Sequence, residues 1–420
     1  MKKLITFLCF SALVIFYYVF SFDKVSFGDC IAYVYLVEKN EWTTTASSLD
    51  HFLYTNALIL FHRIIAIDTI DAIRWFNSLI ASTSVYLFYL ALRNYFNLKF
   101  SVLGVLIMSL SFTFWRSTST IEICSFNTLF LSGFLLFSIR FLKTKNIKDL
   151  HLVAIILGIS FWSHVQNIML IPSFIFLLYL GFKNYGSKTF VSLLAFLTPT
   201  LGLFIPALIQ GYPLIDVYAS SNSSWVAGTF NKSILDYLKD IVIALGYLVY
   251  NLWYFIIPAS VAIFYRFRKI TPSNIFYFFA FGVPFGFGTF YNVSDNYVYF
   301  IGPYQILILY AIDGLRTWSK NNLPMVKWSF FAALAFPLLY FLAFKIALLT
   351  PQGLAFHESK EYKGGLNYYM KPWMNNNVGI LEVYLKDKPH PKDMEWQFTY
   401  AIEFIKLRST YQSLEKIEDL

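Results

Sequence analysis

Acidic side chains, two histidines and an arginine stand at short polar interruptions between long apolar stretches of this chain. These residue types suit group transfer, because a carboxylate can take a proton from a hydroxyl, and cations or a metal can stabilise a departing phosphate. The candidate base is Asp29, which follows the first apolar stretch within Phe27-Gly28-Asp29-Cys30. The other candidates from this pattern are Asp50, His51, Arg116, Glu122, His164 and Asp295.

The main candidates also have structural interpretations. Asp29 could cap a helix that begins at Cys30, since Asp is a preferred N-cap residue, and both roles could hold together. Arg116 could extend its side chain to the membrane surface. His164 could be a hydrogen-bonded residue at the end of a span. The set as a whole favours function, because ionisable residues near membrane level are commonly functional.

The composition defines the class of protein that must position these groups. Of the 420 residues, 57% are hydrophobic and 14% are charged, which excludes a soluble domain. Apolar runs of about twenty residues recur without strand-like alternation, so we predict an all-α integral membrane protein, a polytopic helical bundle. The net charge of +9 is explained by basic membrane turns, and no nucleic-acid partner is expected.

We predict about eleven membrane spans from the apolar stretches. Nearly every turn assigned to the cytoplasm carries two or more Lys or Arg residues, and the candidate residues fall on the opposite turns, at one outer level. Residues 1–349 are predicted to form the transmembrane domain, and residues 350–420 an extracytoplasmic tail. The predicted spans are 4–22, 70–92, 100–114, 123–141, 150–162, 168–182, 190–209, 241–265, 275–291, 297–312 and 329–349.

Three shorter helices are predicted outside the spans. Residues 31–37 and 52–65 are apolar but interrupted, which is typical of helices that lie in the membrane interface. In the tail, residues 395–414 are predicted to form an amphipathic helix that packs on the membrane domain or on its own tail. No catalytic group of residues is evident in the tail. The apolar face of its helix is predicted from Trp396, Tyr400, Phe404 and Leu407.

Cys30 and Cys124 each lie close in sequence to a candidate acid, Asp29 or Glu122. If the two acids converge, the two thiols would be neighbours in an oxidising compartment, where a disulfide could form. We expect instead two unpaired thiols, because free Cys is commonly buried as a small hydrophobic residue.

The order of these motifs resembles the GT-C superfamily of polyprenyl-phosphate-sugar glycosyltransferases, over about residues 1–315. More closely, it is similar to a bacterial branch akin to the luminal protein O-mannosyltransferases of animals. Two features depart from that pattern, since no prolines follow His51 and no second acid follows Asp29 within a few residues. The matching motifs are Gly28-Asp29, Asp50-His51-Phe52-Leu53-Tyr54, Phe114-Trp115-Arg116, Glu122 with Asn127, Gly158 to His164, and Asp295-Asn296-Tyr297.

The resemblance implies an inverting glycosyltransferase with a polyprenyl-phosphate sugar donor and an extracytoplasmic acceptor, which is a protein hydroxyl, a lipid or a glycan. It implies a multi-pass protein of the bacterial inner membrane whose site faces the periplasm or the exterior. No cofactor is assigned from the sequence, and a divalent metal is an alternative. Asp29 is the expected catalytic residue, and the expected donor-binding residues are Asp50, His51, Arg116, Glu122, His164, Asp295 and Tyr297.

Two other classes of function are compatible with the sequence. One is a transporter or flippase of a lipid-linked sugar, in which polar residues should lie near the middle of the bilayer. The other is a non-catalytic membrane subunit. The position of the candidate residues, mainly at one face, favours an enzyme.

Overall fold

A computed structural model describes residues 2–43, 51–211, 213–217, 223–293, 295–319 and 323–420. Within these ranges every regular element is a helix, which confirms the predicted all-α class. The α-helices before the tail are α1 (Lys2–Phe20), α2 (Cys30–Lys39), α3 (Phe52–Ile65), α4 (Thr69–Arg93), α5 (Leu98–Leu110), α6 (Phe112–Ser119), α7 (Ile123–Thr144), α8 (Ile147–Ser160), α9 (Ile171–Tyr185), α10 (Phe190–Gly202), α11 (Ile205–Gln210), α12 (Ser223–Phe230), α13 (Ile234–Leu252), α14 (Ile256–Arg266), α15 (Pro272–Phe290), α16 (Ile301–Ser319), α17 (Leu323–Leu334) and α18 (Phe336–Leu348).

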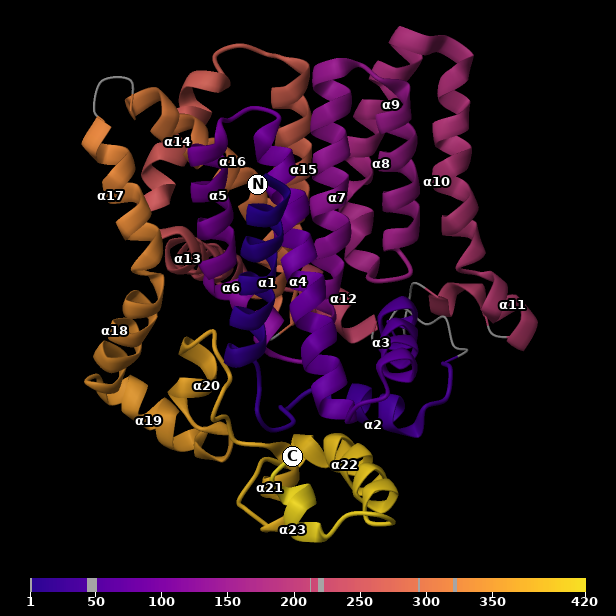
Figure 1. Ribbon diagram of the computed structural model, residues 1–420, viewed down its shortest axis with the longest axis vertical. Helices are drawn as coiled ribbons and strands as arrows, with labels where there is room; N and C mark the ends of the chain where they lie inside the picture. Colours follow the sequence, from indigo (N-terminus) through magenta and orange to yellow (C-terminus); the bar gives the residue numbers. More distant parts are fainter. Residues whose placement is uncertain (1, 44–50, 212, 218–222, 294, 320–322) are drawn as a thin grey trace.

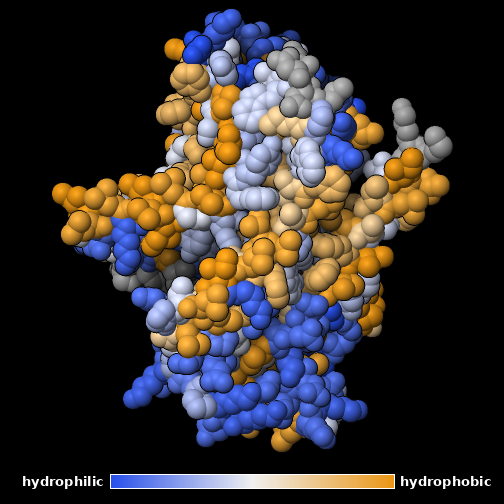
Figure 2. Space-filling model, turned by 90° about the vertical axis from the view of Figure 1, so that its left-hand side faces the viewer, coloured by the Kyte–Doolittle hydropathy of each residue, from blue (hydrophilic) through white to orange (hydrophobic). Residues whose placement is uncertain are grey.

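The molecule has an apolar middle and two polar ends, as Figure 2 shows for one face. Among the described residues, five helical segments are long and apolar enough to cross a membrane, or up to seven if each of two bent helix pairs is one span. This criterion finds fewer spans than the eleven predicted stretches, because several of those stretches form shorter helices. One example is α8, which has 14 residues.

The two ends of the molecule differ in what they carry. In Figure 1 the turns α4–α5, α7–α8, α9–α10 and α14–α15 lie at the upper end, and these are turns that the sequence assigns to the cytoplasm. Helices α2 and α3 lie at the lower end together with the chain after α18. The predicted alternation therefore separates the same two groups of turns as the structure does.

Two predicted spans are bent, and one bend changes the place of a candidate residue. The stretch 100–114 was expected to end at Trp115 and Arg116, but α5 ends at Leu110 and α6 continues at 58° to it. The Thr113 amide nitrogen donates to Asn251 Oδ1 at 2.7 Å, which fixes the start of α6. Arg116 therefore lies inside a short helix rather than in a turn. The stretch 329–349 is similarly divided between α17 and α18, at 54°.

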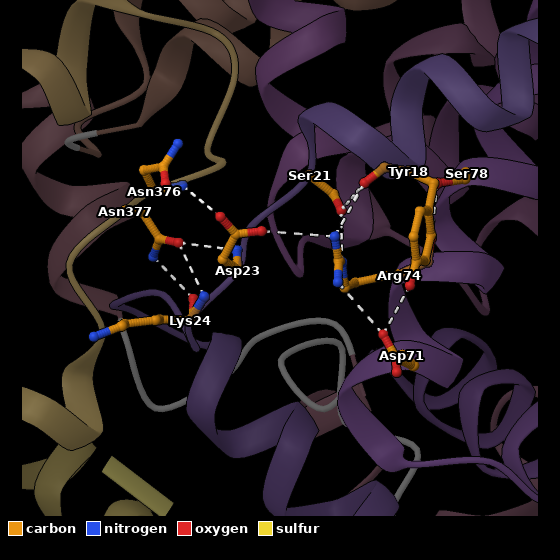
Figure 3. A network of polar contacts seen from close by, with 9 residues as sticks. All are labelled: Tyr18, Ser21, Asp23, Lys24, Asp71, Arg74, Ser78, Asn376 and Asn377. Carbon is orange, nitrogen blue, oxygen red and sulfur yellow. Dashed lines mark hydrogen bonds and ion pairs between the residues drawn. The ribbon is translucent and has the colours of Figure 1, made fainter. Parts of the chain in front are cut away.

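The tail is bound to the loop that follows α1. The side-chain amide of Asn377 accepts from the backbone nitrogens of Asp23 and Lys24, each at 3.1 Å, and donates to the Lys24 carbonyl at 2.8 Å. The Asp23 carboxylate accepts from the Asn376 backbone nitrogen at 2.6 Å and lies 3.7 Å from the Arg74 guanidinium (Figure 3). Tail, first loop and α4 are thus joined. The helices of the tail are α19 (Pro351–Ser359), α20 (Leu366–Met370), α21 (Ile380–Leu385), α22 (Glu395–Arg408) and α23 (Leu414–Glu418).

The buried face of α22 differs from the prediction, which began with Trp396. Trp396 is exposed, whereas the polar side chain of Gln397 is buried. Arg408 is also buried and forms ion pairs with Glu38 at 2.7 Å and Asp68 at 2.6 Å. Phe404 is buried as predicted. The other predicted positions are each shifted by one residue, because Gln397 and Arg408 have polar partners in the segments that precede the tail. The buried residues of α22 are Gln397, Phe398, Ala401, Phe404 and Arg408.

Candidate active site

Three acids from separate segments come within electrostatic reach of one another at the lower end of the molecule. Asp29 precedes α2, Glu122 precedes α7, and Asp295 follows α15. Burial raises the pKa of Glu122 well above its ordinary value, Asp29 and Asp295 raise it further, and Arg116 opposes the shift. Burial also raises the pKa of Asp295, and Asp29 adds to the increase. Asp29, Arg116, Glu122 and Asp295 therefore share one electrostatic environment.

Asp29 stands at the N-cap position of α2, but its side chain makes no capping hydrogen bond. The capping interpretation is therefore wrong for the carboxylate, which is exposed and directed to no backbone group of the helix start. Surrounding protein still removes enough water to raise the pKa of Asp29. The preceding Gly28 has a φ of +82°, a left-handed conformation that favours glycine. Its backbone nitrogen donates to Gln397 Oε1 at 2.8 Å, which connects this turn to the tail.

Arg116 is a buried cation that faces the tail. Its guanidinium lies 4.3 Å from the centre of the Tyr368 ring and donates to the Lys371 carbonyl at 3.5 Å. It also contacts the Met374 sulfur. Among the residues that the structure describes, no carboxylate oxygen lies within 4.0 Å of it. The burial contradicts the interpretation of Arg116 as a side chain that extends to the membrane surface.

The two histidines stack on each other next to Tyr299. The rings of His51 and His164 are 5.1 Å apart, and the His164 ring is 5.8 Å from that of Tyr299. His164 Nδ1 accepts from the Gln166 backbone nitrogen at 3.1 Å, which leaves Nε2 as the protonated nitrogen of the neutral ring. Burial lowers the pKa of His164 well below its ordinary value, and His51 lowers it further. His164 is therefore suited to donate a hydrogen bond rather than to carry a charge.

Tyr33 of α2 links the histidines to the acids. Its ring is 6.2 Å from that of His51. Burial raises its pKa well above the ordinary value, and Asp29 and Glu122 contribute to the increase. The histidines and the acids thus lie around one tyrosine, which sequence reasoning did not select because a Tyr in an amphipathic helix is usually part of its packing.

The remaining predicted residues are placed as follows. Asp50 lies outside the described residues. The Tyr297 ring packs on those of Tyr247 and Phe112, at 5.7 and 6.2 Å. Cys30 and Cys124 are both free and buried, as expected.

The described residues offer no ready metal site. Among them, no group of three or more His, Cys, Asp or Glu side chains is arranged to hold a metal ion. Asp50, which adjoins His51, lies outside those residues.

The tail contributes groups to the site that sequence reasoning missed. Lys363, Tyr368 and Gln397 all approach the loop 27–29 or Arg116. Their contacts join residues more than 250 positions apart in the chain. No periodicity or motif in the sequence predicts such contacts. A single Lys or Tyr in a polar tail does not by itself indicate a functional role.

An apolar cavity lies beside the histidines, between α7, α15, α16 and the short helix 165–170. It has an empty volume of about 540 Å³, part of which is open to solvent. Its walls are mainly aliphatic and aromatic, and its few polar side chains include Gln166, Asn167 and Tyr299. Because the Tyr299 ring also contacts His164, the cavity adjoins the polar site.

The resemblance to GT-C membrane glycosyltransferases that the sequence predicts is confirmed by a family model and by a solved structure of similar fold. Residues 50–209 match the family model described as dolichyl-phosphate-mannose-protein mannosyltransferase. Among solved structures, the chain is similar to the crystal structure of ArnT from Cupriavidus metallidurans bound to undecaprenyl phosphate. The TM-score is 0.60 at 11% identity, over 98% of this chain and 76% of that one, so this likeness concerns the fold. No curated protein matches the sequence.

Proposed function

We propose that this chain is an inverting GT-C glycosyltransferase that moves a sugar from a polyprenyl phosphate to an extracytoplasmic acceptor. The observation that carries this proposal is the convergence of Asp29, Glu122 and Asp295 with the buried Arg116 at one end of the fold. The carboxylates suit activation of a hydroxyl, and the guanidinium suits a phosphate. The match to the mannosyltransferase family and the fold of a protein bound to undecaprenyl phosphate support the class of donor.

The proposed reaction is a single displacement. Asp29 takes the proton of the acceptor hydroxyl, and the oxygen forms a bond to the anomeric carbon of the sugar. The bond from that carbon to the phosphate oxygen breaks on the opposite face, and the polyprenyl phosphate leaves with the electron pair, so the configuration is inverted. The raised pKa of Asp29 makes it a stronger base. Arg116 would stabilise the charge on the leaving phosphate.

Glu122 and the histidines have supporting roles in this proposal. Since the pKa of Glu122 is raised well above its ordinary value, its protonated form can donate a hydrogen bond to the sugar or the acceptor. His164 can donate through Nε2. The apolar cavity next to Tyr299 could hold part of the isoprenoid chain, because its walls are mainly apolar.

The test is transfer by purified protein in lipid, with a panel of polyprenyl-phosphate sugars as donors. Asp29→Asn should reduce turnover by about 100- to 10,000-fold, the usual effect of losing a general base. The thermal unfolding midpoint should not fall, because the Asp29 side chain makes no capping bond. The matched control is Glu415→Gln, at an exposed acid of the tail.

Near-normal turnover by Asp29→Asn would overturn the assignment of the base. A wild-type protein that moves the lipid-linked sugar across a bilayer but transfers none would support the transporter alternative. A protein that only supports transfer by a second chain would be the non-catalytic subunit.

A further inference from the structure

Lys363 and Arg116 form a pair of cations around a single aromatic ring at the interface between the tail and the membrane domain. The Lys363 ammonium lies 5.6 Å from the centre of the Tyr368 ring, and the Arg116 guanidinium lies 4.3 Å from it. Phe27 and Tyr362 complete the surroundings of the ammonium, at 5.1 and 5.6 Å. Within the described part of the chain, neither cation has a carboxylate oxygen within 4.0 Å.

This arrangement is unfavourable without an anion. Both cations are at least half-buried, and burial of an unpaired charge is costly. The rings of Phe27, Tyr362 and Tyr368 compensate part of that cost through cation–π contacts. Burial lowers the pKa of Lys363, and Lys360 and Arg116 lower it further, although Asp393 opposes the shift. The nearest carboxylates act at a distance. One guanidinium nitrogen of Arg116 contacts the Lys371 carbonyl and the Met374 sulfur, and its other nitrogens and the Lys363 ammonium can bind an anion.

The cation pair adjoins the candidate base. Phe27, whose ring contacts the Lys363 ammonium, is only two residues before Asp29. Arg116 lies within electrostatic reach of Glu122. An anion held between Lys363 and Arg116 would therefore lie next to the group that activates the acceptor.

Lys363 is held in place by a tail that is firmly attached. Asn377 bonds to the backbone of the loop after α1, as Figure 3 shows. Gln397 accepts from Gly28, and Arg408 pairs with Glu38 and Asp68. The His357 ring accepts from the Leu366 backbone nitrogen at 3.1 Å, which closes the loop that carries Lys363. The ammonium is thus positioned by the fold rather than free at the surface.

We propose that Lys363 is a phosphate-binding residue that the C-terminal tail supplies to the active site, where it acts with Arg116 on the phosphate of the donor. This inference rests on the proposed function. The planar guanidinium can bind two phosphate oxygens, and the ammonium, a compact point charge, can bind a third. The tail is then part of the donor site, and the membrane domain alone would lack one of its two cations.

The test is binding of a polyprenyl phosphate to the full-length protein in lipid nanodiscs, with the matching polyprenol and inorganic phosphate as comparison ligands. Lys363→Met keeps the apolar stem among the rings and removes the charge. It should weaken polyprenyl-phosphate binding by about 10- to 100-fold, the usual effect of losing a charge-assisted hydrogen bond. Binding of the polyprenol, which has no phosphate, should not change. Lys363→Arg should restore most of the affinity.

The control variant is Lys392→Gln, at an exposed lysine of the same tail, which should bind as the wild type does. If Lys363→Met lowers the unfolding midpoint, two further variants separate the loss of charge from the loss of fold. Lys363→Gln removes the charge with a different side chain, and Lys363→Arg keeps the charge. Equal affinity of Lys363→Met and wild type for polyprenyl phosphate would overturn the inference. Equal weakening for the polyprenol would also overturn it, because the effect would then lie in the apolar contacts.

The two proposals fail in different ways. If Lys363→Met loses the phosphate-dependent affinity but the wild type transfers no sugar from any donor, the phosphate site stands and the proposed transferase fails. If the wild type transfers sugar and Lys363→Met keeps its KM for the donor, the transferase stands and the role of Lys363 fails. Wild-type binding of inorganic phosphate as tight as that of the polyprenyl phosphate would exclude the lipid as the specific ligand.

Discussion

At the scale of single residues, the surroundings of Glu122 decide its protonation. Burial is the largest cause of its raised pKa, followed by Asp29 and Asp295, with Arg116 opposing them. Folding therefore favours the protonated form of this side chain. The contribution of protonated Glu122 to the free energy of unfolding is fully present at pH values below the pKa that this side chain has in the unfolded chain. This contribution is lost as the pH rises through the pKa of Glu122 in the folded state.

Glu122→Gln is therefore expected to stabilise the protein at high pH. The amide is always neutral, so the variant should match the wild type in acid and unfold at an increasingly higher temperature than the wild type as the pH rises. The measurement is the thermal unfolding midpoint from about pH 5 to about pH 9, where linkage to a raised carboxyl pKa would be visible. A difference in unfolding midpoint between Glu122→Gln and wild type that stays constant across this pH range would contradict the raised pKa of Glu122.

Glu382 of α21 is a control for which the opposite dependence of stability on pH is expected. Its pKa is lowered to about 2 by a hydrogen bond from Lys388, with further contributions from Lys24. Its contribution to stability is present above the unfolded pKa and is lost as the pH falls through the folded pKa. Glu382→Gln should therefore destabilise the protein near neutral pH, and the difference from the wild type should shrink in acid.

The positions of the acids could be predicted from the sequence, whereas those of their tail partners could not. Asp29, Glu122 and Asp295 stand next to apolar stretches, so the charge bias of the turns was sufficient to place them at one level. Their actual roles stay predictions. Lys363 and Gln397 reach the site only because the tail docks there, and docking depends on side chains far apart in sequence.

At the scale of elements, α22 shows why the buried face of a helix can be predicted one residue away from its true position. Hydrophobic periodicity treats Arg408 and Gln397 as outward-facing residues, yet both are buried because they have polar partners. Similarly, the bend between α5 and α6 is invisible to hydropathy, because both helices are apolar enough to appear as one span. The amide of Asn251, from a distant helix, holds the start of α6.

Arg408→Met should detach α22 from the membrane domain. The variant leaves the mostly buried Glu38 without its cation, with only the Tyr411 hydroxyl as a partner among the described residues. The loss of one partner from a buried ion pair commonly costs about 3–5 kcal/mol. We expect about 3 kcal/mol, because Asp68 is partly exposed and can be solvated. The measurement is limited proteolysis of the tail together with the free energy of unfolding.

The control for this variant is Lys406→Met on the same helix, whose ion pair with Glu403 is exposed. It should leave the protease pattern unchanged, because exposed ion pairs contribute little. A tail that stays resistant to protease in Arg408→Met would show that Asn377 and the apolar face of α22 are sufficient to hold it.

At the scale of the whole molecule, the tail fixes which parts of the chain share a side. The Ile380 backbone nitrogen donates to the Val25 carbonyl at 2.9 Å, and Arg408 pairs with Glu38. The tail and Asp29 therefore lie on the same side of the membrane. The turns α4–α5, α7–α8, α9–α10 and α14–α15, which are rich in Lys and Arg, lie at the other end in Figure 1. The charge bias then predicts that this other end is cytoplasmic.

This orientation can be tested with single cysteines and an impermeant thiol reagent in intact cells. The background is Cys9→Ser, because Cys9 is exposed, whereas Cys30 and Cys124 are buried. Lys392→Cys in the tail should react in intact cells, and Lys148→Cys in the first turn of α8 should react only after the membrane is opened. Both lysines are exposed in the structure, so a difference in labelling reports the side and not the burial. Labelling of position 148 alone would reverse the orientation, and Asp29 and the cation pair would then face the cytoplasm together with the tail.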